Sequence, residues 1–598
     1  MKNKKTTPPN SLAALPETLF GVLPLKTILI FIGLLPLWPL LFLLFANQQT
    51  ASDDNVLTDI DFAIIMPYLT TTFYMVMTTG ILAVIFGISL AWFFEFFTFP
   101  AKKLLSWLVL TPFALPPYIA AMVYIEQLSP EGFLASYLTP LIGFFNPRDW
   151  RLASMVMALS LYPYVYLLAR SFLSSSLHIT SSLEMARVLG FSMQKCFWFL
   201  FLPLMIPQMM TGFILVGLEV MADYGAMSFF AVRTLSIGMF DLWLNLGQIN
   251  YARYFCVVIF LLVFLLLALN YFSQNFHFIG WRLRRKYNIP SGKPTLYRRP
   301  IALSPMAVVG LFSYLLPLLF FAFGLPCLSL LFWFLAPLWQ TDGLFHITAW
   351  LDGISQTLPA MGTSFLLSSL AALGMMLFAI TIGFAERQWR IYWLKVPLVL
   401  GYAMPGVILA FGVLTIGFYI IGFFSHDNDK WRDSGYYNII MVGLLFYGYL
   451  AKFSASFFIA VASGYRAISM NIDNAARVLG ERPIKLFGNM VSGFVYQTRS
   501  AKKNWHKDII GGVLGLIHLP LLRPALLAGF LITFIEIIKE LPITLVLRPF
   551  GVETLALRLF TLVSDERIHL AALPAMLIVL VSMVSIWLTK KYWLQVRD

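Results

Sequence analysis

Long apolar stretches alternate with short polar segments along almost the whole 598-residue chain. Because about 20 apolar residues form a helix that crosses a ~30 Å hydrocarbon core, each long stretch predicts one transmembrane helix. The stretches lie near 27–46, 69–94, 104–125, 152–169, 204–222, 254–273, 306–338, 359–385, 396–424, 438–464, 521–547 and 569–589. This pattern predicts an all-α polytopic membrane protein with about twelve transmembrane helices.

The distribution of Lys and Arg predicts the orientation of these helices, since cytoplasmic loops of membrane proteins are enriched in basic residues. With the amino terminus inside, basic residues fall in the cytoplasmic segments, whereas the predicted external segments 47–65 and 339–356 contain no Lys or Arg. We therefore expect both termini in the cytoplasm. The stretch 27–46 follows three lysines but is longer than the apolar region of a signal peptide, so we interpret it as a retained first helix.

Composition narrows the possible chemistry. The chain is 59% hydrophobic, and its net charge of +14 lies in segments beside apolar runs, so we expect contact with membrane lipid and none with nucleic acid. The three cysteines, Cys196, Cys256 and Cys327, are far apart in the sequence, which indicates neither a disulfide framework nor a zinc site. "SGKPT" at 291 lacks the features of a phosphate-binding loop. We assign no catalytic residue, metal ligand or cofactor to this chain.

Short sequences recur at matching places in the two halves, which indicates an internal duplication. "ALPPYIAA" at 114 matches "AMPGVILA" at 403, and "EMARVLG" at 184 matches "NAARVLG" at 474, with offsets of 403 − 114 = 289 and 474 − 184 = 290. "LPLMIPQMMTGFILVGLEVMADYG" at 202 matches "LPLLRPALLAGFLITFIEIIKELP" at 519, with an offset of 317. We predict two parallel six-helix repeats, 1–280 and 306–598, joined by a basic cytoplasmic linker at 281–305. The linker either sets topology or also binds anionic lipid headgroups.

The loop 183–203 has a distinctive pattern. It reads Glu184-Met185-Ala186, three residues, Gly190, nine residues, Leu200, one residue and Leu202-Pro203. This resembles the E-A-A-x3-G-x9-I-x-L-P loop of ABC importer permeases. The resemblance implies a type I ABC importer permease fold, in which the loop forms a short helix, turns at the glycine and docks on a dimeric cytoplasmic ABC ATPase that supplies ATP and Mg²⁺. The ATPase-coupling residues in this copy are Glu184, Ala186, Arg187 and Gly190.

The second copy of the loop, 473–520, departs from the pattern. Asn474 replaces the glutamate, although Asp473 is adjacent, and about 27 extra residues form an insertion near 488–514. The insertion is either a tolerated surface excursion or an extra contact. The expected coupling residues are Asp473, Asn474, Ala475, Ala476, Arg477 and Gly480. The alternative for either copy is an ordinary amphipathic loop between helices.

Each helix after a coupling loop carries a pair of carboxylates four residues apart: Glu219 with Asp223, and Glu536 with Glu540. Such spacing places each pair on one helix face. Exposing a carboxylate to lipid at the bilayer centre costs roughly 2.5 to 3.5 kcal/mol, so we expect these groups to line the substrate pathway between the halves. The alternative is a structural brace in which Lys539 neutralises a carboxylate.

The segment 536–581 resembles the corresponding stretch of fused ferric-iron permeases, as does "ADYGAMSFFAVRTLSIGMFDLW" of the first half. This resemblance implies a permease of the bacterial inner membrane that carries ferric iron delivered by a periplasmic ferric-binding protein. It is no enzyme, because ATP hydrolysis is expected on the separate subunit. Related permeases carry thiamine or organophosphonates, and a gradient-driven twelve-helix transporter or a membrane-embedded enzyme are further alternatives.

Overall fold

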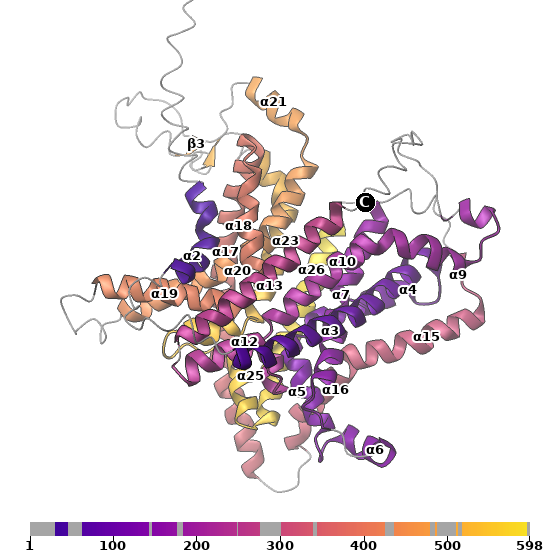
Figure 1. Ribbon diagram of the computed structural model, residues 1–598, viewed down its shortest axis with the longest axis horizontal. Coiled ribbons are helices and arrows are strands. Elements are labelled where there is room, and N and C mark those ends of the chain that lie inside the picture. The colour runs from indigo at the N-terminus through magenta and orange to yellow at the C-terminus, as the bar shows by residue number, and fades with distance from the viewer. Residues whose placement is uncertain are drawn as a thin grey trace, which may run out of the picture.

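The computed structural model describes twelve parts of the chain, namely residues 30–45, 62–142, 146–175, 183, 185–247, 249–275, 301–338, 344–424, 436–478, 485–486, 510–511 and 517–594. Within these residues the protein is almost entirely helical, as the apolar pattern predicts (Figure 1). The exceptions are two small sheets, each formed by two very short strands. The fold class predicted from the sequence, an all-α polytopic membrane protein, is confirmed.

The first half contains, in chain order, η1 (Leu35–Leu37), α2 (Trp38–Phe45), α3 (Phe62–Phe96), β1 (Phe97–Thr98), α4 (Lys102–Leu108), η3 (Thr111–Ala114), α5 (Pro117–Leu128), α6 (Phe133–Ile142), α7 (Trp150–Ser175), α9 (Met193–Cys196), η4 (Phe197–Phe201), α10 (Leu202–Ala222), α11 (Gly225–Phe229), α12 (Leu235–Phe240), η5 (Asp241–Asn245) and α13 (Ile249–Asn275).

The second half contains β2 (Ile301–Ala302), α15 (Pro305–Leu319), η6 (Phe320–Gly324), α16 (Leu325–Leu335), η7 (Ala336–Leu338), α17 (Leu344–Trp389), η8 (Tyr392–Leu394), α18 (Lys395–Ala403), α19 (Gly406–Phe424), α20 (Tyr436–Ala467), α21 (Met470–Val478), β3 (Lys485–Leu486), β4 (Ile510–Gly511), α23 (Leu519–Ile538), α24 (Pro542–Leu547), α25 (Leu555–Ser564) and α26 (Ile568–Leu594).

The described residues include nine helices long and apolar enough to cross a membrane, and two bent helix pairs that raise this number to eleven. A shorter apolar helix, Ile30–Leu43, occupies the place of the first predicted span. Each of the twelve predicted apolar stretches therefore corresponds to a helix or a bent pair. The predicted stretch 521–547 is divided, because α23 ends at Ile538 and α24 follows.

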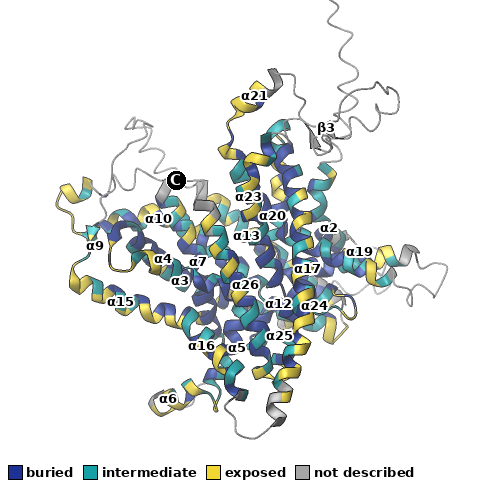
Figure 2. Cartoon of the chain, turned by 180° about the vertical axis from the view of Figure 1, so that it is seen from behind, coloured by how far each residue is buried: buried dark blue, intermediate teal, exposed yellow. Residues whose placement is uncertain are grey.

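The two halves use the same helix pairings. In the first half α3 packs on α7 and α10, α10 packs on α13, and α12 packs on α13. In the second half α17 packs on α20 and α23, α23 packs on α26, and α25 packs on α26. Buried residues concentrate where these helices meet, and exposed ones follow outer helices such as α6 and α15 (Figure 2).

The first helix of each half also packs against the opposite half. Helix α2 contacts α19, and η1 contacts α18, whereas α16 contacts α5 as well as α26. Tyr447 donates a hydrogen bond to the Leu35 carbonyl at 2.7 Å, and Tyr124 donates one to the Phe321 carbonyl at 2.6 Å. Leu35 lies in a 3-10 turn and Phe321 in a π segment, where backbone carbonyls depart from the regular helical pattern. The two hydroxyls therefore fasten each kinked first helix to the other half.

Most of the predicted linker, 281–300, lies outside the described residues. Its end is described: β2 pairs in parallel with β1 and Leu303 donates to the Thr98 carbonyl at 3.2 Å. Ser304 then caps α15 by accepting from the Ala307 amide. The start of the second half is thus hydrogen-bonded to the turn that follows α3.

Candidate functional site: an acidic cavity between two broken helices

A cavity of about 160 Å³ lies where the two halves meet. Both bent helix pairs line it: Lys102–Ala114 with Pro117–Leu128, bent by 88°, and Tyr392–Ala403 with Gly406–Ile421, bent by 108°. The predicted single helices 104–125 and 396–424 were wrong in this respect. The matched motifs "ALPPYIAA" and "AMPGVILA" mark the two breaks.

Proline explains why both helices break at matching positions. Leu115 and Met404 each precede a proline, and steric contact with the proline ring disfavours the helical conformation of the preceding residue. Both residues are extended, with ψ values of 108° and 140°. The breaks bend the backbone at the junction between the halves, and the carbonyl of Phe113 beside the first break accepts a side-chain hydrogen bond.

All four sequence-predicted pathway carboxylates line this cavity, but the second member of each pair lies at or just beyond a helix end. Helix α10 ends at Ala222 and α23 ends at Ile538, so Asp223 and Glu540 lie beyond the helix ends. Each instead accepts from a backbone amide three residues later, Asp223 from Ala226 at 2.7 Å and Glu540 from Ile543 at 3.2 Å. The second carboxylate of each pair thus caps the element that follows the helix, a contact that the four-residue spacing did not predict.

The other two carboxylates are less firmly held. The Tyr402 hydroxyl lies 3.4 Å from Glu219 Oε1, a long hydrogen bond that joins the two halves. Glu536 is hydrogen-bonded to Ser456, and its Oε2 has no partner among the described residues. Unlike Asp223 and Glu540, neither Glu219 nor Glu536 accepts from a backbone amide in the contacts of the described residues.

Two lysines complete the polar lining, and only Lys539 was considered in the sequence analysis. Lys452 forms an ion pair with Glu540 at 2.9 Å. Gly406 permits this contact, because a Cβ there would lie 2.7 Å from Glu540 Oε1 and 3.0 Å from Lys452 Nζ. The signal for Lys452 was available, since it is the single charged residue in the apolar stretch 438–464.

Lys539 joins the two halves rather than neutralising Glu536 through a direct ion pair. Its ammonium donates to the Phe113 carbonyl at 2.7 Å, and its own carbonyl accepts from the Tyr118 hydroxyl at 3.2 Å. Both partners come from the broken helix of the first half. With the Tyr402–Glu219 contact, three polar links cross the junction around the cavity.

Two of the four carboxylates have the contacts expected of a structural brace, and the other two do not. Asp223 and Glu540 cap short helices, and Glu540 is paired with a lysine, which are features of a brace. Glu219 and Glu536 face the cavity without such fixation. In the described part of the chain, no group of three or more His, Cys, Asp or Glu side chains is placed to hold a metal ion. All four carboxylates line this one cavity.

The first coupling loop has a well-defined turn. Gly190 has a φ of +87°, and the amides of Gly190 and Phe191 donate to the carbonyls of Arg187 at 2.9 Å and Ala186 at 3.0 Å. These two bonds form a Schellman motif, in which glycine is favoured at the left-handed position. Arg187 is exposed and Ala186 is half-buried, while Glu184 lies outside the described residues.

The second coupling loop contains helix α21, which lies at the opposite end of the molecule from α6 (Figure 1). Asn474 and Ala475 are exposed, but Asp473 is 2% exposed and faces into the protein. The side chains of Ala476 and Arg477, and all of Gly480, lie outside the described part. The same holds for 488–509 and 512–514 of the predicted insertion 488–514.

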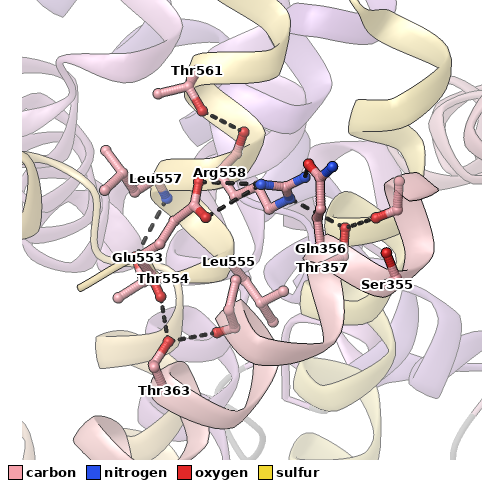
Figure 3. Close-up of polar contacts among 12 residues, drawn as sticks. Ser355, Gln356, Thr357, Thr363, Glu553, Thr554, Leu555, Leu557, Arg558 and Thr561 are labelled. Atoms are coloured by element: carbon pink, nitrogen blue, oxygen red, sulfur yellow. Dashed lines mark hydrogen bonds and ion pairs between the residues drawn. The ribbon is translucent and has the colours of Figure 1, made fainter. Parts of the chain in front are cut away.

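A second polar network was missed in the sequence and links α25 to α17. Arg558 is 9% exposed and forms an ion pair with Glu553 at 3.2 Å, while it also donates to Gln356 at 2.9 Å and Thr357 at 3.3 Å (Figure 3). The signal was another repeat, "VRTLSIGMF" at 232 and "VETLALRLF" at 552.

The two copies of this repeat are held in the same way. The Leu235 amide donates to the Thr72 hydroxyl at 3.0 Å, and the Leu555 amide donates to the Ser364 hydroxyl at 2.7 Å. These matching bonds give an offset of 364 − 72 = 292 between α3 and α17. The two halves therefore share this hydrogen bond as well as the helix order.

Matching helix pairings in the two halves, paired helix breaks at a polar junction and two loops of similar sequence are features that the comparison with known proteins can interpret. The chain is 22% identical over 536 residues to the Fe(3+)-transport system permease protein FbpB 2 of Haemophilus influenzae, covering 88% of this chain and 89% of the relative. It is also 27% identical over 253 residues to the probable sulfate transport system permease protein cysT of Marchantia polymorpha, covering 40% and 85%.

A third relative is the molybdenum transport system permease protein ModB of Escherichia coli, 27% identical over 180 residues that cover 29% of this chain and 77% of the relative. No family model matches the chain. The relatives confirm the resemblance to permeases of ABC transport systems, including the fused ferric-iron permeases. The chain is accordingly a multi-pass transport component of the inner membrane.

Proposed function

We propose that the chain is a two-repeat permease of an ABC importer and that it carries ferric iron. The observation that supports this substrate is the acidic lining of the cavity between the broken helices. Four carboxylates and two lysines face it, so full ionisation leaves a net charge of 2 − 4 = −2. A surplus of carboxylates at this junction favours a cation, and carboxylate oxygen is a suitable ligand for a hard ion.

The acidic lining bears on the choice among the relatives' substrates. Sulfate and molybdate are oxyanions, and a −2 cavity repels them. The extent of the similarity also favours ferric iron as the substrate. The ferric-iron permease matches both halves of this chain, whereas the sulfate and molybdenum permeases each match less than half of it.

The proposed partners are a dimeric cytoplasmic ATPase, which binds ATP and Mg²⁺, and a periplasmic binding protein that delivers ferric iron. ATP-driven closure of the ATPase moves the coupling segments at 183–190 and α21. The motion separates the links that Lys539, Tyr118 and Tyr402 make across the junction and opens the acidic passage to one side of the membrane. Both chain termini lie in the cytoplasm in this proposal.

The test uses the purified complex of the chain with its ATPase in lipid vesicles, with the binding protein added. Ferric iron, sulfate and molybdate are supplied in parallel, and ATP hydrolysis and uptake are measured for each. We expect ferric iron alone to stimulate both. Stimulation by either oxyanion would reject the substrate, and uptake driven by an ion gradient without ATPase would reject the class of transporter.

A further inference from the structure

The second coupling helix is fastened to the bundle by a buried cluster of charged and polar side chains. Asp473 on α21 forms an ion pair with Arg387 of α17 at 2.7 Å and lies 2.9 Å from Nε2 of His518, which directly precedes α23. The side chains of all three are nearly inaccessible, with exposed fractions of 7% for Arg387, 3% for Asp473 and 0% for His518. We call these three residues the α21 clamp.

Arg387 extends the clamp to a fourth helix. Its guanidinium donates to the carbonyls of Tyr465 at 2.7 Å and Ile468 at 3.0 Å, at the end of α20, and to that of Ser469 at 3.2 Å. The guanidinium thus satisfies carbonyls that a helix end leaves without intrahelical partners. One buried side chain thereby holds the ends of α17 and α20 together with the start of α21.

The matching positions of the first half are apolar. The offsets of 290 and 317 place Leu183 opposite Asp473 and Phe201 opposite His518. Leu183 is 4% exposed and Phe201 is fully buried, and both belong to the same hydrophobic core. The offset of 292 places Glu95 opposite Arg387, and Glu95 lies 3.9 Å from Arg170. At the two described positions that match Asp473 and His518, the first half therefore has apolar packing where the second half has polar and charged contacts.

The insertion explains why the second half needs a different fastening. In the first half Gly190 is followed after only two residues by α9, so the coupling segment and the following membrane helix are close in sequence. In the second half 518 − 478 = 40 positions separate the end of α21 from His518. Closing a longer loop costs more conformational entropy, and a contact between its two ends offsets that cost. The antiparallel pair β3–β4 also closes this loop.

We propose that the α21 clamp makes α21, α17 and α23 a single mechanical unit, so that displacement of α21 reaches the cavity residues at the far end of α23. Helix α23 has 20 residues, or about 30 Å of rigid length, between His518 and the segment that contains Glu536 and Lys539. Arg387, Asp473 and His518 are positioning residues, since they touch neither the cavity nor the exposed face of α21. The inference relies on the proposed function only for the identity of α21 as the coupling helix.

The clamp depends on a neutral histidine. A carboxylate only accepts hydrogen bonds, so His518 donates from Nε2, and in the neutral ring its Nδ1 then carries a lone pair. Nδ1 is buried and has no partner among the described residues. Burial lowers the pKa of His518, while Asp473 raises it and Arg387 lowers it; Tyr465, 5.3 Å away between ring centres, is the remaining titratable neighbour. Asp473 itself has a lowered pKa: burial opposes the shift, and hydrogen bonds from Arg387 and His518 outweigh it.

The sign of the pH effect follows from these directions. A histidine with a lowered pKa contributes its full stabilisation above the unfolded value of 6.5, and the contribution is lost as pH falls below that value. Asp473 loses its contribution only below its own unfolded value of 3.8. Mild acid between these two values therefore acts on the clamp through His518.

The experiment measures the distance between spin labels on the exposed positions 474 of α21 and 521 of α23, after the three native cysteines are replaced by serine. It uses the full chain alone, without ATPase or iron. We expect one narrow distance above pH 6.5 that broadens in mild acid. Asp473→Ala should give the broad distribution at every pH. His518→Gln, which keeps an N–H donor but does not titrate, should stay narrow at every pH.

Labels at 188 and 204 of the first half provide the matched control, and their distance should not respond to pH. An Asp473→Ala distribution as narrow as that of the parent would overturn the clamp. A parent that ignores acid, or a His518→Gln variant that responds as the parent does, would overturn the role of His518. Since no substrate is present, these failures are distinct from a failure of the proposed transport function.

Discussion

At the scale of single residues, the hydrogen bonds of the four cavity carboxylates separate their roles. Glu219 and Glu536 accept from no backbone amide in the contacts of the described residues, whereas Glu540 is paired with Lys452 and caps α24. The double variant Glu219→Gln with Glu536→Gln should therefore fold normally and lose uptake by about ten-fold or more, the effect of at least ~1.4 kcal/mol on a transport rate. Uptake by vesicles and thermal unfolding in detergent measure the two quantities.

Glu540→Gln is the matched control for this variant, because it makes the same chemical change at a braced position. Removing one partner of a buried ion pair costs about 3 to 5 kcal/mol, so we expect a lower unfolding temperature and less assembled protein. If the double variant fails to assemble while Glu540→Gln is unaffected, the assignment of pathway and brace is reversed.

At the scale of one element, the turn at Gly190 can be tested by backbone conformation alone. Gly190 has a left-handed φ, and no atom lies within 4 Å of the place where a Cβ would be. Gly190→Val therefore introduces backbone strain of about 1 to 2 kcal/mol without a clash. We expect the turn to unwind and the ATPase to co-purify poorly, while membrane insertion is retained.

Gly190→Asn is the control, since asparagine tolerates the left-handed conformation better than other residues with a side chain. It should preserve most ATPase binding in the same pull-down. Equal loss in both variants would show that the space around Gly190, rather than its φ, matters for docking. Equal retention would contradict the assignment of this segment to the ATPase interface.

Helices and their order could be predicted from the sequence because apolar length is a local property. The helix breaks were harder to predict from the sequence. "ALPPYIAA" contains two prolines, but membrane helices tolerate proline. The predicted helices therefore continued through Leu115 and Met404. The ends of α10 and α23 were missed for a related reason. Asp223 and Glu540 satisfy amides of the following turns, a contact that spacing alone does not reveal.

At the cavity, too, contacts between residues far apart in the sequence could not be predicted. The four carboxylates were identified from their cost in a membrane, and the structure places all of them at one cavity. Tyr118, Tyr402 and the Phe113 carbonyl carry no charge. The cost of charge in a membrane, which identified the carboxylates, therefore gave no reason to single them out. Asp473 was predicted to face a partner, yet its pairing with Arg387 and His518 requires residues 86 and 45 positions away to meet.

At the scale of the whole molecule, the exchange of first helices joins the two repeats independently of the linker. Helix α2 packs closely on the second half, because a Cβ at Gly412 would lie 2.3 Å from the Pro39 carbonyl and one at Gly401 would lie 3.4 Å from Pro36. The Tyr447–Leu35 bond adds a polar contact at the same place. Association of the halves therefore depends on packing between membrane helices, in which close backbone approach and hydrogen bonds supply the attraction.

This arrangement predicts that the chain tolerates a cut in its linker. Co-expressed fragments 1–290 and 291–598 should co-purify in equal amounts, because the α2 contacts and the Lys539–Phe113, Tyr118–Lys539 and Tyr402–Glu219 links remain. Deleting residues 1–61, which removes α2, should reduce recovery of the partner fragment while leaving α3 to α13 intact. Fragments that separate in mild detergent with α2 present would contradict the prediction and make the covalent linker the essential connection.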